Sequence, residues 1–418
     1  MKLFNFYKCL IVTAITAAAY SCGSSDDGNG INTDPNWVDT GENYCSTNPS
    51  QYTGQNGNYF FIQQQDRNQN SATYQQYRLI PDPSNDGRCA TGYSPTVSST
   101  NITTGRYISF ATYGDRVFAA EVQYGILEYV NGQWITPVGM TNDVKNNIFY
   151  AKMKQGAGGA FFISCSKGIY YQTGDNNYKV GYPAGGSNDM SGGLGGSNTN
   201  FFASAGADWG GIFKWNGSSF ISTNQVTGCF YSIEALNEND VFFGSYGKSN
   251  GSTGDGYTFG VMRWDNSQQK VVKTNLETGE YNVATFNNRM YAANGNNVYV
   301  WDGSTFNELY SNGGGQLGVT GGNLYLSNAS GIYKFDGTTF NLMLSGDYYI
   351  NYPASNVLSF EDRLYAFGIS GIKVYYNGNW SDVASSPTYV STGVASTPGL
   401  FAGGKDNDNG IFKIAKQY

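Results

Sequence analysis

Carboxylates, tyrosine and arginine are the side chains of this chain that could do chemistry, because the sequence contains no histidine. The absence removes Ser-His-Asp and Cys-His nucleophile systems and histidine-containing zinc sites. Carboxylate chemistry, as in many glycan-cleaving enzymes, stays possible. However, Glu234, in the run SIEAL, could face the central channel of the fold, but a single inward glutamate is a weak case. Asp406 and Asp408 lack the spacing of a calcium loop. We therefore expect no catalytic residue, no metal and no cofactor, and we keep an enzyme as an alternative.

Aromatic and acidic residues gather in four segments: SAGADWGG, GSYGKSNGSTGDGYTFG, SGDYYINYP and GGKDNDNG. Aromatic rings can cover the C–H surface of a sugar while carboxylates orient its hydroxyl groups. Exposed side chains here would form a surface for a glycan or a protein partner, unless the segments are simply long loops of a tyrosine-rich chain. The candidate binding residues are Asp208, Trp209, Tyr246, Asp255, Tyr257, Tyr348, Tyr349, Tyr352, Asp406 and Asp408.

A repeated pattern must position these segments. GIYKFDGTTF, GIFKWNGSSF and NVYVWDGSTF are copies of it, and GGAFFISCSKGIY matches GGNLYLSNASGIY without a gap. The copies recur at intervals typical of solenoids and propellers. Eight copies fill the chain from residue 103 onward, starting at Gly125, Gly168, Gly211, Gly260, Asn297, Gly331, Gly371 and Gly410.

Each copy predicts four short strands, because its runs are brief and rich in β-branched and aromatic residues. The second strand is apolar on both faces, as expected for a sheet packed between two others. We predict an all-β fold, a β-propeller with eight four-stranded blades, or seven if the glycine-rich third copy is irregular. The last copy lacks a fourth strand before Tyr418, so an N-terminal strand, from Asn58 or Thr73, should close the ring.

Asp-Gly and Asn-Gly pairs lie between the expected third and fourth strands, as at Asn131, Asn216, Asp302 and Asp336. These dipeptides tolerate the positive φ of a type I′ hairpin turn. Their carboxylates are therefore expected to serve turns and not catalysis. The aromatic residue that follows should begin the outer strand and pack between blades.

The repeat resembles kelch-type repeats and the propeller repeats of bacterial two-component sensors, in which a Gly-Ile/Leu-Tyr run, an aromatic residue and Asp/Asn-Gly recur in this order. The resemblance covers the chain from residue 103 onward and implies a propeller fold. The kinase and membrane-spanning parts of those sensors have no counterpart in this sequence, so we do not expect a direct signalling role.

The N-terminus predicts a cellular address. A positively charged start and the apolar run 9–19 are typical of a signal peptide, and the run is too short to span a bilayer permanently. The residues up to Cys22 resemble the processing box of bacterial lipoproteins, which implies that Cys22 is lipidated; ordinary cleavage near Ser21 is the alternative. Asp26 and Asp27 resemble signals that route such lipoproteins to the outward face of the outer membrane, unless they belong to a generic linker.

These features divide the chain into a signal peptide (1–21), a flexible polar tether (22–57), N-terminal strands with the closure segment (58–102) and the propeller (103–418). Cys45 and Cys89 could form a disulfide in an oxidising compartment, although spacing alone cannot fix the pairing. The net charge of -7 and the lack of a basic cluster argue against a nucleic-acid partner.

The leading functional hypothesis is a non-catalytic, lipid-anchored cell-surface protein that recognises a glycan or protein partner through the loop-rich face of the propeller. One alternative is a carbohydrate-active enzyme of the hydrolase or lyase type, with Asp, Glu and Tyr at the channel mouth. Another is a structural accessory subunit of an envelope complex. Propellers host all three, so the fold cannot separate them.

Overall fold

The computed structural model divides into two compact units, residues 1–93 with 418 and residues 94–417, which are described separately. Apart from the 3-10 turn η3 (Ala157–Gly159), the described elements are strands. The described residues contain no helix that is long and apolar enough to cross a membrane. The structure describes residues 37–46, 59–66, 68, 77–81, 97–105, 108–140, 151–174, 176–183, 192–205, 211–227, 229–245, 260–311, 313–348, 356–360, 363–376, 378–383, 386, 389–396, 399–404 and 410–414.

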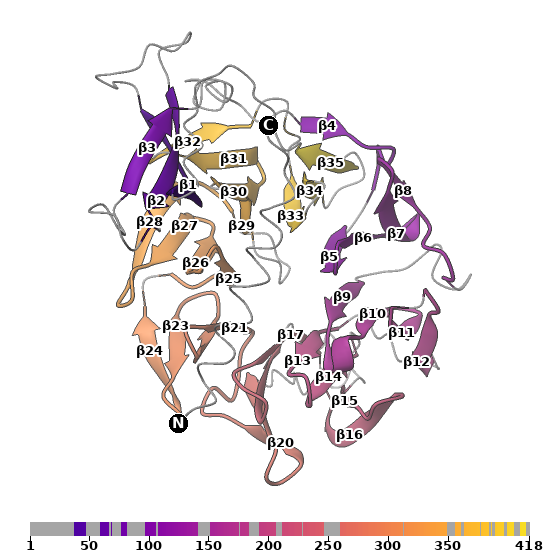
Figure 1. The fold of residues 1–418 in the computed structure, drawn as a ribbon. Coiled ribbons are helices and arrows are strands. Elements are labelled where there is room, and N and C mark those ends of the chain that lie inside the picture. The colour runs from indigo at the N-terminus through magenta and orange to yellow at the C-terminus, as the bar shows by residue number, and fades with distance from the viewer. Residues whose placement is uncertain are drawn as a thin grey trace. The chain divides into compact units, whose positions relative to one another are not determined.

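The first four blades of the larger unit follow one another along the chain as four-stranded antiparallel sheets (Figure 1). Blade 1 contains β5 (Ser109–Tyr113), β6 (Arg116–Glu121), β7 (Gly125–Val130) and β8 (Gln133–Ile135). Blade 2 contains β9 (Lys152–Gln155), β10 (Phe161–Cys165), β11 (Gly168–Gln172) and β12 (Lys179–Pro183). Blade 3 contains β13 (Leu194–Gly196), β14 (Phe201–Ser204), β15 (Gly211–Trp215) and β16 (Phe220–Thr227). Blade 4 contains β17 (Phe230–Ala235), β18 (Asp240–Ser245), β19 (Val261–Asp265) and β20 (Lys270–Lys273).

The remaining four blades repeat the arrangement. Blade 5 contains β21 (Asn282–Phe286), β22 (Arg289–Ala293), β23 (Val298–Trp301) and β24 (Phe306–Tyr310). Blade 6 contains β25 (Gln316–Thr320), β26 (Asn323–Asn328), β27 (Gly331–Phe335) and β28 (Phe340–Ser345). Blade 7 contains β29 (Val357–Phe360), β30 (Arg363–Gly368), β31 (Gly371–Tyr376) and β32 (Asn379–Asp382). Blade 8 contains β33 (Val390–Ser396), β34 (Gly399–Gly404), β35 (Ile411–Ile414) and β4 (Val97–Ser99).

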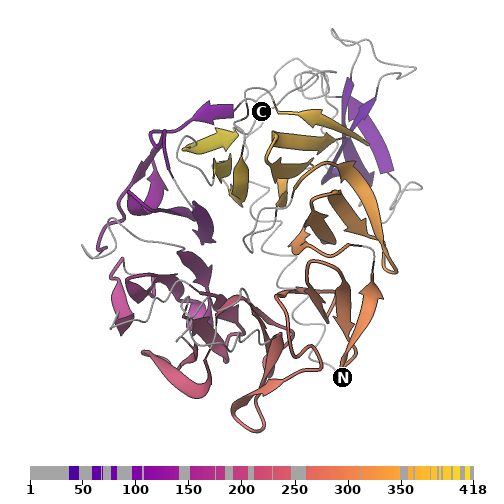
Figure 2. The same cartoon turned by 180° about the vertical axis from the view of Figure 1, so that it is seen from behind.

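The first strands of the blades line the centre of a closed ring, as Figures 1 and 2 show from its two sides. Each first strand contacts that of the next blade, and β33 of blade 8 returns to β5 of blade 1. The fold is therefore a β-propeller with eight four-stranded blades, as predicted. The glycine-rich third copy is a complete blade, although its β13 is only three residues long.

An N-terminal strand closes the ring, as expected, but the segment differs from the two proposed. β4 supplies the outer strand of blade 8, with Val97 opposite Ile414. The expected segments form β2 (Tyr59–Asp66) and β3 (Tyr77–Pro81) instead, in a separate three-stranded sheet with β1 (Trp37–Ser46). β4 directly precedes blade 1 in the chain, so it closes the ring with the shorter loop and the smaller entropic cost.

The three-stranded sheet belongs to the smaller unit and is antiparallel, in the order β1-β2-β3. β1 lies inside the segment expected to be a flexible tether, a departure that its aromatic and β-branched residues explain. Its register is irregular between Asp39 and Asn43. Cys45 pairs in the sheet with Phe60, whereas Cys89 and the lipidation residue Cys22 lie outside the described residues.

The second strand of each blade is deeply buried because both of its faces pack against other blades. β10, β14 and β34 are buried along their whole length. Aromatic rings join successive blades: the centroids of Phe162 and Phe201 are 4.7 Å apart, and those of Phe202 and Phe243 are 5.1 Å apart. Burying such a ring stabilises the fold by about 1.5–3 kcal/mol. The expected two-sided apolar strand is confirmed.

Asparagine side chains tie the outer edges of neighbouring blades together. Asn275 follows β20 of blade 4; its Nδ2 donates to the carbonyl oxygen of Phe306 (2.8 Å) and its Oδ1 accepts from the Phe306 N–H (2.7 Å). Asn101 makes the same pair of bonds with Trp134, which joins blade 8 to blade 1. Phe306 and Trp134 are both buried in inter-blade clusters, as predicted for the aromatic residue that begins the outer strand.

The turns between the third and fourth strands are of two kinds. Asn131 and Gly132 have φ of 49° and 87° and connect the paired residues Val130 and Gln133. This two-residue loop, with positive φ at both central positions, is the predicted type I′ turn.

At Asp302 the type I′ prediction is wrong, because only Gly303 of the pair has a positive φ (108°). The loop has four residues and closes the pair Trp301–Phe306. Asp302 Oδ1 accepts from the N–H groups of Ser304 and Thr305, both at 2.8 Å, and these bonds hold the pKa of its carboxyl well below the ordinary value. The carboxylate thus replaces the hydrogen bonds that a tighter turn would make.

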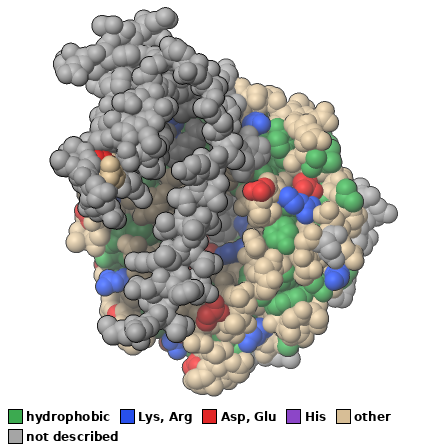
Figure 3. All heavy atoms as spheres, in the orientation of Figure 1, with side chains coloured by type: hydrophobic (Ala, Val, Ile, Leu, Met, Phe, Trp, Pro, Cys, Tyr) green, Lys and Arg blue, Asp and Glu red, His purple; other side chains and the backbone are tan. Residues whose placement is uncertain are grey.

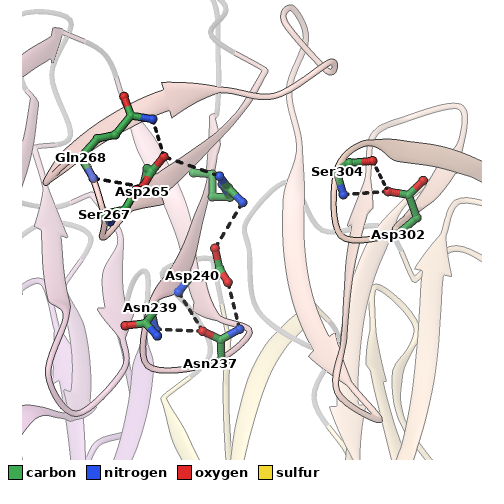
Figure 4. Close-up of polar contacts among 9 residues, drawn as sticks. Asn237, Asn239, Asp240, Asp265, Ser267, Gln268, Asp302 and Ser304 are labelled. Atoms are coloured by element: carbon green, nitrogen blue, oxygen red, sulfur yellow. Dashed lines mark hydrogen bonds and ion pairs between the residues drawn. The ribbon is translucent and has the colours of Figure 1, made fainter.

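Other blades use the same side-chain bonds. Asp336 and Asn216 each accept N–H groups of the residues two and three positions later. Figure 4 shows Asp265 with Ser267 and Gln268 beside the Asp302 turn. These side chains serve turns, as expected. The type I′ prediction is wrong at Asn216 and Asp336 as well, because only Gly217 and Gly337 of these pairs have a positive φ.

Candidate ligand-binding site in the channel

A pocket of about 340 Å³ lies among the first strands of five successive blades, β9, β13, β17, β21 and β25. Its lining combines apolar residues with amides, hydroxyls and three charged side chains. A volume in this range is typical of sites that take a small ligand. Because the first strands form the inner edge of the ring, the pocket belongs to the channel of the propeller.

The neutral polar groups of the lining join one blade to the next. Asn282 Nδ2 donates to the carbonyl oxygen of Gly315 (2.7 Å), and its Oδ1 accepts from the Leu317 N–H (2.9 Å). Thr285 Oγ1 donates to the carbonyl oxygen of Ala235 (2.8 Å). These bonds satisfy backbone groups at the inner edges of the sheets, so they explain the polar lining in structural terms.

Two of the charged groups form an ion pair. Lys154 Nζ of β9 lies 3.0 Å from Glu234 Oε1 of β17, and the two side chains are 37% and 40% exposed. Glu234 thus lies in the channel, as the sequence suggested, but as the partner of a lysine. β13 of blade 3 lies between these two strands in the chain order of the blades, and a Cβ on its Gly195 would lie only 2.0 Å from the carbonyl oxygen of Ile233. The glycine lets β17 approach blade 3 closely.

Lys152 is the third charged group. It begins β9, is half-buried, and forms no ion pair or side-chain hydrogen bond with the described residues. Removal from water lowers the pKa of its ammonium to about 8. Because Glu234 is paired with Lys154, the pocket carries one uncompensated positive charge, although the chain as a whole carries -7.

The strand registers show that this lysine departs from the repeat. Lys152 lies opposite Ser164 and Gln316 lies opposite Ser327. Ser164 and Ser327 correspond in the ungapped match between the second and sixth copies. Lys152 therefore occupies the place that a neutral glutamine fills in blade 6.

On the face that Figure 3 draws, the charged side chains of the described residues lie singly or in small mixed groups. Figure 3 shows such groups on one face of the described part of the molecule, where blue and red side chains are scattered among neutral ones. Arg263, for example, lies between Asp240 (3.3 Å) and Asp265 (3.9 Å).

Only one of the ten predicted binding residues lies in the described part of the chain. Tyr348 is 3% exposed, its ring packs against the backbone of Gly368, and burial raises the pKa of its hydroxyl to about 12. The expected exposure of Tyr348 is wrong, because its backbone N–H bonds to the carbonyl oxygen of Asn328 and holds the residue against blade 6. Outside the described residues lie Asp208, Trp209, Tyr246, Asp255, Tyr257, Tyr349, Tyr352, Asp406 and Asp408.

Sequence reasoning missed Lys152 and Lys154. A signal exists in the alternation KMK of β9, which places two lysines on one side of a first strand where blade 6 has glutamine and glycine. Within the described part of the chain, no group of three His, Cys, Asp or Glu residues could hold a metal ion.

The fold and pocket define an eight-bladed β-propeller with a polar channel. No protein-family model and no curated protein matches the chain. Among solved structures, the computationally designed Ika8 protein is 13% identical, with a TM-score of 0.51, over 76% of this chain and 98% of the other. BamB from Moraxella catarrhalis is 12% identical, with a TM-score of 0.51, over 78% and 98%. At such identities the likeness shows a shared fold and not a shared function.

Proposed function

We propose that the protein is a non-catalytic binding protein, lipid-anchored at the cell surface, that recognises a glycan or a protein partner at one end of its propeller. The observation that supports it best is the polar channel pocket, whose carboxylate is held in an ion pair and whose neutral groups join the blades. Such a pocket offers fixed polar contacts without a carboxylate placed for proton transfer.

The strand order supports a role for the predicted binding segments beside this pocket. In an antiparallel blade the first strand begins at the end where the second strand finishes and the third begins. Lys152 begins β9, so it lies at that end of blade 2. The segments that contain the predicted residues connect strand ends of the same kind: β14 to β15, β18 to β19, β28 to β29, and β34 to β35. A ligand that spans the pocket and these segments would meet one end of the propeller.

Affinity electrophoresis tests the proposal. The protein is run through gels cast with a panel of polysaccharides beside an inert control protein, and each polymer is then assayed for new reducing ends. Retardation by one polymer without new reducing ends supports glycan binding. New reducing ends would replace the proposal with the carbohydrate-active enzyme, and uniform mobility would leave the protein partner, to be sought by crosslinking on intact cells.

The lipid anchor is tested separately by Cys22→Ser. Cys22 follows small residues at the end of the apolar leader, so its loss should release the protein from membranes into the soluble fraction. Unchanged membrane association of the variant would contradict the anchor.

A further inference from the structure

We propose that Lys152 binds the acidic group of an anionic sugar in the channel pocket, so that the recognised glycan is an acidic one. The inference rests on the proposed function and names the class of glycan. Its three supports are the position of the lysine, the charge of the pocket and the hydrogen-bonding groups around it.

The position of Lys152 suits a ligand-binding site, because this lysine does not belong to a structural ion pair. Lys154, two residues later on the same side of β9, has its counterion in Glu234 at 3.0 Å. Lys152 shares the pocket with that pair but forms no such contact with the described residues. A half-buried ammonium costs free energy unless an anion or other oxygen ligands compensate it. A carboxylate or sulfate in the pocket would supply that compensation through a charge-assisted hydrogen bond.

The charge selects an acidic ligand over a neutral one. Lys152, Lys154 and Glu234 together leave one positive charge in a channel that protein surrounds, where screening by salt is weaker than at the surface. Because the chain is acidic overall, with a net charge of -7, this attraction acts at short range inside the channel. The lowered pKa of Lys152, about 8, agrees with a cation that lacks a partner and is still protonated at neutral pH.

The inner edges of the sheets supply contacts for sugar hydroxyls. β9 pairs with β10 on one side, so its other backbone edge faces the channel. The same holds for the first strands β17, β21 and β25, each paired within its sheet on one side only. Asn282 and Thr285 bond some backbone groups on these edges, and the other N–H and C=O groups donate and accept hydrogen bonds as hydroxyl groups require. A volume of about 340 Å³ limits the occupant to a small part of a polymer, such as a terminal sugar.

The test is isothermal titration calorimetry on the full chain, extracted in a mild detergent. The probes are D-glucuronate, the neutral methyl ester of D-glucuronic acid, D-glucose and D-glucose 6-sulfate. The variants are Lys152→Met, which keeps most of the side-chain volume, and Lys152→Arg, which keeps the charge. Lys179→Met is the matched control, because Lys179 lies on the outer strand β12 beside the ring of Tyr171.

We expect an acidic sugar to bind at least about tenfold more tightly than its neutral counterpart, because its charged group forms a charge-assisted hydrogen bond with Lys152; a tenfold difference corresponds to about 1.4 kcal/mol. Lys152→Met should abolish this preference, whereas Lys152→Arg and Lys179→Met should keep it. Preference for glucuronate would assign a carboxylate-bearing sugar, and preference for glucose 6-sulfate a sulfated one.

Two results would overturn the inference. One is an acid preference that persists in Lys152→Met while melting curves show both proteins folded. The other is equal or absent binding of acidic and neutral probes. If a neutral polysaccharide still retards the protein in gels, the proposed glycan-binding function stands without the acidic ligand; if no polymer does, glycan binding falls as well.

Discussion

Lys154 Nζ and Glu234 Oε1 lie 3.0 Å apart although their strands belong to blades 2 and 4, which blade 3 separates. The pair neutralises one of the two lysines of β9 and leaves Lys152 as the uncompensated charge of the pocket. It also gives the acidic residue that the sequence placed near the channel a defined electrostatic role.

Glu234→Gln should tighten the binding of an acidic sugar several-fold, because it removes the negative charge from the pocket and frees Lys154. The free energy of unfolding should change by less than about 1 kcal/mol, since both partners are more than a third exposed. Calorimetry and denaturant unfolding measure the two effects, with the double variant Lys154→Met/Glu234→Gln as control. Loss of binding in Glu234→Gln would show instead that the carboxylate contacts the ligand.

Gly195→Ala should destabilise the propeller by about 1–3 kcal/mol, because the added Cβ would lie 2.0 Å from the carbonyl oxygen of Ile233. Gly295→Ala is the matched control, since a Cβ at Gly295 meets no atom within 4 Å. Chemical denaturation compares them. Equal midpoints for the two variants would contradict the close approach of β13 and β17.

Asn275→Ala should lower the free energy of unfolding by about 1–3 kcal/mol, because it leaves the backbone N–H and C=O of Phe306 without their partners between blades 4 and 5. Asn341→Ala, which removes a bond to Asp336 in an exposed turn, should cost less. If both variants unfold at the same denaturant concentration, the contact between blades contributes no more than the turn.

The repeat made the propeller predictable because every blade satisfies the same local rules. The sequence shows the turns between strands, a second strand that is apolar on both faces and an aromatic residue at the start of the outer strand. Phe162 and Phe306 lie where these rules place them. The closing strand was not predictable in this way. Val97–Ser99 is short and carries two serines, so its pairing with β35 depends on proximity in the fold and not on a pattern.

The site was less predictable than the fold for a physical reason. The sequence predicted a site of exposed aromatic residues in long loops, yet the ring of Tyr348 is buried against Gly368. Lys152 was overlooked because a lysine in a short strand ordinarily belongs to a solvated face. Only the register of β9 with β10, compared with that of blade 6, shows that it replaces a neutral residue in the channel.

Lys152→Met should have a larger free energy of unfolding than the natural protein at neutral pH, and this difference should shrink as pH rises. The pKa of Lys152 is lowered to about 8 in the folded state, so below pH 8 the ammonium is charged in both states and its burial opposes folding. Between about 8 and the ordinary value of 10.5 the unfolded chain binds more protons, and this cost disappears. The titratable groups that share the pocket are Lys154, Tyr231 and Glu234. Urea unfolding of both proteins from pH 7 to 10 measures the difference, and an advantage that stays constant would contradict the buried charge.

The most direct test of ligand binding in the channel is nuclear magnetic resonance of the protein with its lysines reductively methylated with ¹³C, the Lys152 signal being assigned by its absence in Lys152→Met. The free protein should show Lys152 titrating below the ordinary lysine value of 10.5, because burial lowers its pKa. Saturation with the preferred acidic sugar should shift the Lys152 signal and raise the pKa of Lys152, since a bound anion favours the charged form. The chemical shift of the Lys179 signal at neutral pH, which serves as the control, should not change. An unchanged Lys152 titration in the presence of a sugar that calorimetry shows to be bound would place the ligand elsewhere and contradict the channel site.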